Sequence, residues 1–150
     1  MQRRSFLLSA VAIPFATLPA LAISPEVIEV MKSPSCGCCG AWASHLDNAG
    51  LKTEIRNVDD EQLWTMKDRL GITAELASCH TALAGTYVIE GHVPAADIQR
   101  LLSERPDAIG LTVPGMPLGS PGMEMGAERD AFETLLIRAD GSTEVFARHS

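Results

Sequence analysis

Positive charge is scarce in this sequence. The chain has 12 lysines and arginines against 19 aspartates and glutamates, and its formal net charge is −7. A surplus of negative charge repels nucleic-acid phosphates and anionic lipid headgroups. The composition therefore argues against nucleic acid and membrane surfaces as partners, and it suits a metal cation.

Long apolar runs are absent after the N-terminal segment. Residues 6–18 form one apolar run, which follows Arg3 and Arg4 and precedes a small-x-small sequence ending at Ala22. This order is typical of a secretory signal peptide, and the run is short for a membrane span. We therefore expect residues 1–22 to be an export signal cleaved near Ala22; an uncleaved N-terminal anchor is the alternative.

The route of export stays open. The start "RRSFLL" resembles a twin-arginine signal, which directs folded proteins across the membrane, but paired arginines also occur in ordinary secretory signals. By either route we expect residues 23–150 to form one periplasmic domain of ordinary size. Cleavage removes two basic and no acidic side chains, so the mature chain is still more acidic.

The first half of the mature chain alternates between strand and helix signals. Residues 27–31 are a short apolar run with β-branched side chains, which predicts a buried strand. Helical spacing then runs from Cys39 to Gly50, so cysteines lie at a helix N-terminus. Residues 51–58 alternate as a half-exposed strand does, and Asp59 is a suitable N-cap for a second helix.

The second half contains weaker signals. Residues 73–85 show no clear period, whereas residues 86–90 return to strand character and residues 95–102 form a short amphipathic helix. The segment that we name the Gly/Pro/Met loop, residues 110–126, is too rich in glycine and proline for a regular element. Apolar runs on both sides of Asp140-Gly141 predict a terminal β-hairpin.

This order predicts an α/β fold with a thioredoxin/glutaredoxin-like core, followed by the Gly/Pro/Met loop and the hairpin. "TYVIEGHVPAADIQRLL" looks like the last strand-turn-helix of a glutaredoxin. Thioredoxin-like oxidoreductases have a proline just before their third strand, and "TALAGTYV" has none. The missing proline weakens the case for dithiol exchange on protein substrates.

Three of the four cysteines fall within "SCGCC". Cys36 and Cys39 have C-x-x-C spacing at a strand-to-helix turn, where the helix dipole favours thiolate, so alone they would form a redox dithiol. Cys38 does not fit that picture, because a third thiolate beside a working pair invites disulfide scrambling. A metal site explains three clustered thiolates better. A redox-active Cys36–Cys39 bridge and two structural disulfides remain alternatives.

The residue types indicate which metal. Thiolates and thioethers select monovalent copper, whereas structural zinc usually has two separated ligand pairs. Cys79 and His80 lie in a segment that such a fold places beside the cysteine turn, so we expect them to complete a site for one or more Cu(I) ions. Zinc and an iron–sulfur centre use the same thiols and stay open as alternatives.

The methionines of the Gly/Pro/Met loop are a second set of soft ligands. Met116, Met123 and Met125 are candidate copper ligands, and packing beneath the loop is the alternative. His92 follows a turn within reach of the site, and we expect it to be solvated. Trp42 and Trp64 occupy helical core positions, and we expect both to be packed inside.

Four motifs in order, "SCGCC", "SCHTA", "YVIEGHVP" and "VPGMPLGSPGME", resemble the CopG-type family of small periplasmic copper-resistance proteins. The resemblance spans residues 27–125. It implies a thioredoxin-like fold that binds copper through C-x-C-C and C-H motifs, here Cys36, Cys38, Cys39, Cys79 and His80. It also implies copper handling or redox interconversion, with other periplasmic copper-handling proteins as partners. It assigns no ligand role to the methionines.

Taken together, the sequence predicts a periplasmic protein that contributes to copper resistance and homeostasis by binding copper at cysteine thiolates, with possible interconversion of copper oxidation states. A periplasmic thiol-disulfide oxidoreductase that uses Cys36 and Cys39 is the alternative.

Overall fold

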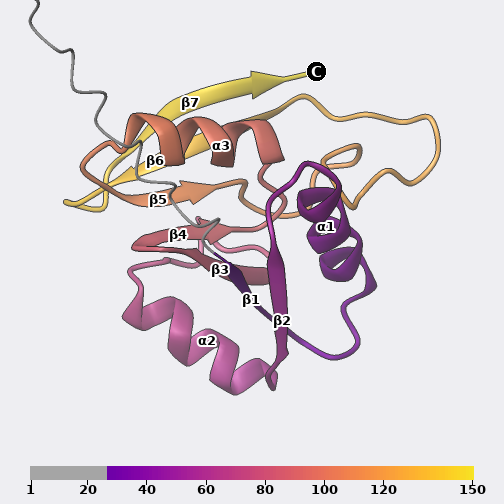
Figure 1. The fold of residues 1–150 in the computed structure, drawn as a ribbon, viewed down its shortest axis with the longest axis horizontal. Coiled ribbons are helices and arrows are strands. Elements are labelled where there is room, and N and C mark those ends of the chain that lie inside the picture. The colour runs from indigo at the N-terminus through magenta and orange to yellow at the C-terminus, as the bar shows by residue number, and fades with distance from the viewer. Residues whose placement is uncertain (1–26) are drawn as a thin grey trace, which may run out of the picture.

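A computed structural model describes residues 27–150, so the expected export signal lies outside the described residues (Figure 1). The elements are β1 (Ile28–Lys32), α1 (Gly37–Asn48), β2 (Thr53–Asn57), α2 (Asp60–Arg69), β3 (His80–Ala84), β4 (Tyr87–Glu90), α3 (Ala95–Glu104), β5 (Ala108–Thr112), β6 (Phe132–Arg138) and β7 (Thr143–His149). Within residues 27–150, no helix combines the length and the apolar character that crossing a bilayer requires.

All seven described strands form one mixed sheet in the order β2-β1-β3-β4-β5-β6-β7. The pairs β1/β2 and β4/β5 are parallel, and the other neighbours are antiparallel. The predicted α/β class is confirmed. Both parallel pairs are joined through a helix, as parallel neighbours require, because a tight turn cannot reverse the chain twice.

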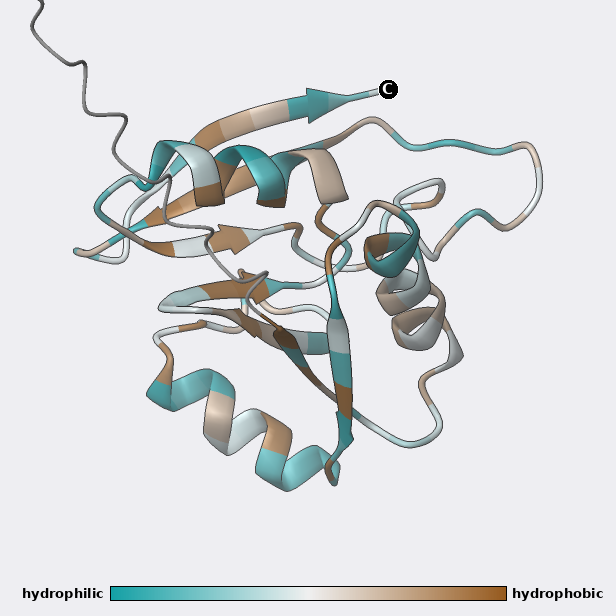
Figure 2. Ribbon diagram, in the orientation of Figure 1, coloured by the Kyte–Doolittle hydropathy of each residue, from teal (hydrophilic) through white to brown (hydrophobic). Residues whose placement is uncertain are grey.

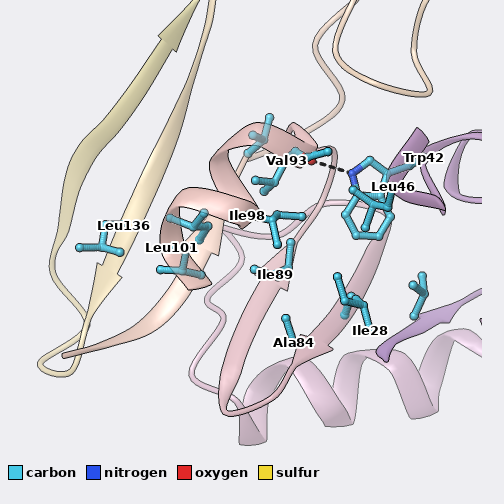
Figure 3. Packing of buried hydrophobic residues seen from close by; sticks show 14 residues of the cluster. Ile28, Trp42, Leu46, Ala84, Ile89, Val93, Ile98, Leu101 and Leu136 are labelled. Atoms are coloured by element: carbon cyan, nitrogen blue, oxygen red, sulfur yellow. Dashed lines mark hydrogen bonds between the residues drawn. The ribbon is translucent and has the colours of Figure 1, made fainter. Parts of the chain in front are cut away.

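The main core lies between one face of the sheet and the helices α1 and α3. Trp42 and Leu46 of α1 pack with Ile98 and Leu101 of α3 against strand residues such as Ile89 (Figure 3). The indole Nε1 of Trp42 donates a hydrogen bond of 2.8 Å to the Val93 carbonyl, so this buried ring leaves no donor unpaired.

The opposite face of the sheet is covered by α2 and the segment that follows it. Ile72 packs there with Val88 and Ile137. The neighbouring residue Ile89 points into the main core instead, as the alternation of side chains along a strand requires. In Figure 1, α2 and α3 lie on opposite sides of the central strands, and Figure 2 shows those strands as the most hydrophobic part of the chain.

Most of the predicted elements occur where the sequence places them. Asp59 caps α2, because its carboxylate accepts a hydrogen bond of 2.8 Å from the Gln62 amide. Gly50 takes a φ of 86° after α1, as a residue beyond a helix C-terminus commonly does. Pro94 precedes α3 as its N-cap.

Two strands, β3 and β5, were missed. Residues 73–85 contain β3, so the strand at residues 86–90 is the fourth and not the third. Because β3 is paired on both edges and buried on both faces, its sequence shows no alternation. The residue before β3 is Cys79, so the proline of thioredoxin-like oxidoreductases is absent from the correct position as well.

The Gly/Pro/Met loop is shorter than expected, because its first three residues belong to β5. Gly110 is the reason that the sequence did not predict this strand. A Cβ atom at this position would lie 1.8 Å from the Val88 carbonyl oxygen, and the register with β6 shifts between Ala108 and Gly110. A glycine inside a strand often marks such a close backbone approach.

The prediction for Trp64 was wrong. Its side chain is 48% exposed, whereas Lys67 on the same helix is buried. Leu63 and Lys67, four residues apart, form the inward face of α2, which turns Trp64 outward.

The terminal hairpin is confirmed and extends the sheet beyond β5. Asp97 of α3 holds it, since its Oδ2 accepts hydrogen bonds from Thr134 Oγ1 at 2.6 Å and from His149 Nε2 at 2.9 Å. The ring of His149 also stacks on Phe132. These contacts fasten both strands of the hairpin to α3 and to each other.

Candidate metal centre

Strand pairing brings the two cysteine segments together. Lys32, the last residue of β1, pairs with His80, the first residue of β3. The turn that follows β1 and the residue that precedes β3 therefore lie at the same end of these two neighbouring strands. Cys36, the N-cap of α1, and Cys38 and Cys39 in its first turn lie beside Cys79 for this reason, although about 40 positions separate them in the sequence.

The four sulfur atoms form one cluster. Cys36 and Cys39 are joined in a disulfide, and Cys38 and Cys79 are free thiols. Cys38 Sγ lies 3.5 Å from Cys36 Sγ and 3.9 Å from Cys79 Sγ, while Cys39 Sγ lies 3.4 Å from Cys79 Sγ. All four are close enough together to surround a metal ion once the disulfide is reduced.

Two histidines reach the same cluster. Cys79 Sγ lies 3.4 Å from His80 Nδ1 and 3.1 Å from His92 Nε2. The expectation of a solvated His92 was wrong, because its side chain is fully buried. Because β3 and β4 are antiparallel, the end of β4 lies beside the start of β3. Residues just after β4 therefore lie beside residues just before β3.

The position of His92 follows from strand register. In the β3–β4 register Thr81 faces Glu90, so a residue two positions beyond Glu90 lies next to Cys79. Recognising β3 would have revealed this proximity.

Hydrogen bonding prepares His92 to act as a ligand. Its Nδ1 lies 2.8 Å from the Pro121 carbonyl, which can only accept, so Nδ1 carries the proton. Nε2 is then unprotonated and directed at Cys79 Sγ. A second ring nitrogen held by a carbonyl is the usual support of a histidine that binds a metal.

His80 is fully buried as well. Its ring centroid is 4.3 Å from that of Trp42 and 5.0 Å from that of His92. Its Nε2 is the one buried side-chain nitrogen or oxygen in residues 27–150 that has no hydrogen-bond partner. The other ring nitrogen, Nδ1, is the one that lies against Cys79 Sγ.

In the absence of metal, burial determines which side chains of the cluster carry a proton. It lowers the pKa of His92, and it lowers that of His80 well below 6.5 with help from the nearby His92 and Lys67. Both imidazoles are therefore neutral at pH 7. Burial, reinforced by the Cys38 charge, raises the pKa of Cys79 to about 12, so its thiol keeps its proton until a metal replaces it.

The Gly/Pro/Met loop covers this cluster. Besides the bond from His92 to Pro121, Ser78 Oγ donates to the Gly115 carbonyl. Gly122 lies so close to α1 that a Cβ atom there would be 2.7 Å from the Cys38 carbonyl oxygen. The long loop is thus packed onto the cysteine turn.

The three loop methionines differ in position. Met123, next to Gly122, is only 9% exposed, whereas Met116 and Met125 are 52% and 70% exposed. One thioether is therefore within the covered part of the loop, and two are presented to solvent.

A family model matches part of the chain. Residues 76–123 match a family described as "Protein of unknown function, DUF411", a segment that contains Cys79, His80 and His92. No curated protein matches the chain.

Two solved structures are similar over nearly the whole chain. "Copper resistance protein copG- Form 2" is 41% identical, with a TM-score of 0.78, and the match covers 85% of this chain and all of the other. "Copper resistance protein copG- Form 1" is 42% identical, with a TM-score of 0.77, and the match covers 84% of this chain and 98% of the other. The chain belongs to the family of CopG copper resistance proteins.

Proposed function

We propose that this protein binds monovalent copper at the cluster of cysteines and histidines and thereby contributes to copper resistance. The observation that carries the proposal is the meeting of Cys38, Cys79 and His92: two free thiols 3.9 Å apart, with an unprotonated imidazole nitrogen 3.1 Å from one of them. The similar solved structures carry the name of copper resistance proteins.

The donor set fits Cu(I). Thiolates are the soft ligands that this ion prefers, and neutral imidazole binds it as well. Cys38, Cys79, His80 and His92 are available in the oxidised protein. Reduction of the Cys36–Cys39 disulfide adds two thiolates and completes a group of four sulfurs. Bridging thiolates can hold more than one ion, so the copper number is expected to rise on reduction.

A redox role extends this proposal. The Cys36 and Cys39 thiolates can give one electron each to two Cu(II) ions, which yields two Cu(I) ions and one Cys36–Cys39 disulfide. The disulfide present in the structure is the protein product of that step. The histidines tolerate Cu(II) and the thiolates stabilise Cu(I), so a mixed cluster suits both sides of the exchange.

The methionines are proposed as auxiliary ligands. Met123 lies in the covered part of the loop, and the exposed Met116 and Met125 are placed to collect Cu(I) from solvent. Thioethers carry no proton at neutral or acidic pH, so they bind Cu(I) under conditions in which thiols are protonated.

The proposed setting is the periplasm, and the proposed architecture is thioredoxin-like. Arg3, Arg4 and the apolar run after them support export, with cleavage near Ala22. The strand order β2-β1-β3-β4 with α1 at the cysteine turn supports a thioredoxin-like core, to which β5, β6 and β7 are added. Other periplasmic copper-handling proteins are the proposed exchange partners.

A second candidate function is thiol-disulfide exchange. The Cys36–Cys39 disulfide at the N-terminus of α1 favours it. The crowding of Cys38 and Cys79 against that bridge argues against it, because nearby thiols divert a disulfide from an external substrate.

Elemental analysis of protein purified from the periplasm, together with free-thiol counting, tests these functions. Bound copper with reducible thiols supports the proposal. The exchange function would be established instead if the protein contains no metal, does not bind added Cu(I) and has a reducible Cys36–Cys39 bridge. Metal-free protein with two inert bridges would leave only a disulfide-stabilised module.

A further inference from the structure

A buried ion pair lies beneath the metal centre. Lys67 of α2 is 1% exposed and contacts Glu90 of β4, which is fully buried. Removing two charges from water costs several kcal/mol for each ion, and attraction between them offsets this only when hydrogen bonds satisfy the remaining atoms. The cost raises the question of what the pair does.

Both carboxylate oxygens of the pair accept hydrogen bonds. Glu90 Oε1 accepts from Lys67 Nζ and, at 2.6 Å, from the backbone amide of Ser78. Glu90 Oε2 accepts from the Thr81 hydroxyl at 2.7 Å, and that hydroxyl accepts from Lys67 Nζ at 2.8 Å. Burial raises the pKa of Glu90, and Lys67, Thr81 and Ser78 oppose that rise. One carboxylate thus joins α2, β3, β4 and the segment before β3.

The residues that Glu90 touches flank the donor atoms of the cluster. Ser78 directly precedes Cys79, Thr81 directly follows His80, and Glu90 itself is two positions before His92. The carboxylate is therefore fixed to both chain segments that carry Cys79, His80 and His92. Its position decides how these segments lie relative to each other.

Gly91 tightens the same junction. Its amide donates to the His80 carbonyl at 3.1 Å. It has a φ of +73°, and a Cβ atom there would lie 2.5 Å from Ser78 Cβ. The end of β4 is therefore pressed directly against the residue before Cys79.

We propose that Glu90, held by Lys67, is a positioning residue of the metal centre, which fixes Cys79 Sγ and His92 Nε2 at the separation that a shared ion needs. The inference rests on the proposed function. Fold stability alone does not explain the pair, because apolar residues of similar volume often replace a buried ion pair without loss of stability. On α2 such a residue would simply continue the inward face that Leu63 begins.

Two uncharged double variants separate positioning from stability. Lys67→Met/Glu90→Met keeps the bulk but removes the acceptor for the Ser78 amide. Lys67→Met/Glu90→Gln also removes both charges but keeps an acceptor oxygen. Arg138→Met/Glu144→Met removes an exposed ion pair of the hairpin and serves as the matched control.

The measurements are Cu(I) affinity by competition with a chromogenic chelator, the ultraviolet thiolate-to-copper absorption band, and the unfolding midpoint of the metal-free protein. For the Met/Met variant we expect a folded chain with a lower midpoint, because the Ser78 amide and the Thr81 hydroxyl lose their acceptor. We also expect an affinity at least tenfold weaker and an altered band, since residues that orient metal ligands contribute about 10–100-fold. The Met/Gln variant should recover most of the affinity, and the control should match wild type.

Two results distinguish the possible failures. Wild-type protein that binds no Cu(I) overturns the proposed function itself. If the wild type binds Cu(I), and a folded Met/Met variant binds it with the same affinity and the same absorption band, only the positioning role is overturned. If that variant does not fold, Glu90→Asp takes its place, because it keeps the charge and withdraws the carboxylate by one methylene. Unchanged affinity in Glu90→Asp overturns the inference, and weakened affinity supports it.

Discussion

His92 Nε2 lies 3.1 Å from Cys79 Sγ, although 13 positions separate the two residues. The contact arises from the β3–β4 pairing and is fixed by the bond from His92 Nδ1 to the Pro121 carbonyl. A histidine that looks like a turn residue in the sequence is thus part of the cluster.

Replacement of His92 should weaken copper binding. His92→Phe keeps a ring of similar bulk and removes the nitrogen donor, so the Cu(I) dissociation constant should rise at least about tenfold, the loss found even for residues that only support a ligand. Competition with a Cu(I) chelator measures it. His45→Gln, which changes a histidine that accepts from the Ala95 amide outside the cluster, should bind as wild type does. Equal affinities in the two variants would remove His92 from the site.

Cys38 is the thiol that a simple C-x-x-C exchange site does not need. Cys38→Ser should therefore lower the copper bound per reduced chain, because it deletes one of the four thiols of the cluster. Elemental analysis after gel filtration gives the ratio, and Ser35→Ala in the same turn is the control. A ratio equal to that of wild type would contradict the cluster.

The loop methionines can be tested together. Changing Met116, Met123 and Met125 to Leu keeps their bulk and removes the thioethers, so we expect weaker Cu(I) binding with little change in stability. The loss should be largest at acidic pH, where thiols are protonated. Met66→Leu on α2 is the control. An unchanged affinity at both neutral and acidic pH would assign the three methionines to packing.

Gly122 should be essential to the cover over the cluster. Gly122 and Gly126 share a φ of +85°, but only Gly122 lies against the Cys38 carbonyl and the Trp42 amide. Alanine at either position strains the backbone, whereas overpacking adds a further cost of about 1–3 kcal/mol at Gly122 alone. Urea unfolding of Gly122→Ala and Gly126→Ala isolates that difference. Equal losses would show that the loop can move away from α1 freely.

The metal-free protein should lose stability in mild acid. The pKa of His80 lies well below 6.5 in the folded chain, so below that pH the unfolded chain binds a proton that the folded chain refuses. The free energy of unfolding then falls by up to about 1.4 kcal/mol for each pH unit, until the pH reaches the folded pKa.

His80→Phe removes this term. Urea unfolding at pH 7 and pH 5 should therefore give a smaller difference in stability for the variant than for wild type, with the disulfide intact in both. Parallel losses in the two proteins would mean that His80 becomes protonated without unfolding.

Local patterns were sufficient for much of the fold. Asp59 and Gly50 mark helix ends through their own chemistry, and Asp140-Gly141 marks the hairpin, so these features were predictable from neighbouring residues. β3 was not, because a central strand buried on both faces has no alternation. Gly110 hid β5, because its small size serves a contact with Val88 on the neighbouring strand.

The same limit applies to the candidate site. The cysteine motif is local, and the nearness of Cys79 follows from the expected order of elements. His92 and Lys67 depend on strand register and on how α2 faces the sheet, which pairwise spacing in the sequence does not reveal.

The pairing of Lys32 with His80 also has a consequence for folding. A metal ion held between Cys38 and Cys79 closes a loop of 41 residues, in the manner of a cross-link. A covalent link over such a loop reduces the entropy of the unfolded chain by an amount worth about 4 kcal/mol. The loop contains β2 and α2, and its ends meet only after β1 has paired with β3. A copper ion bound between these cysteines would therefore stabilise the assembled sheet against unfolding.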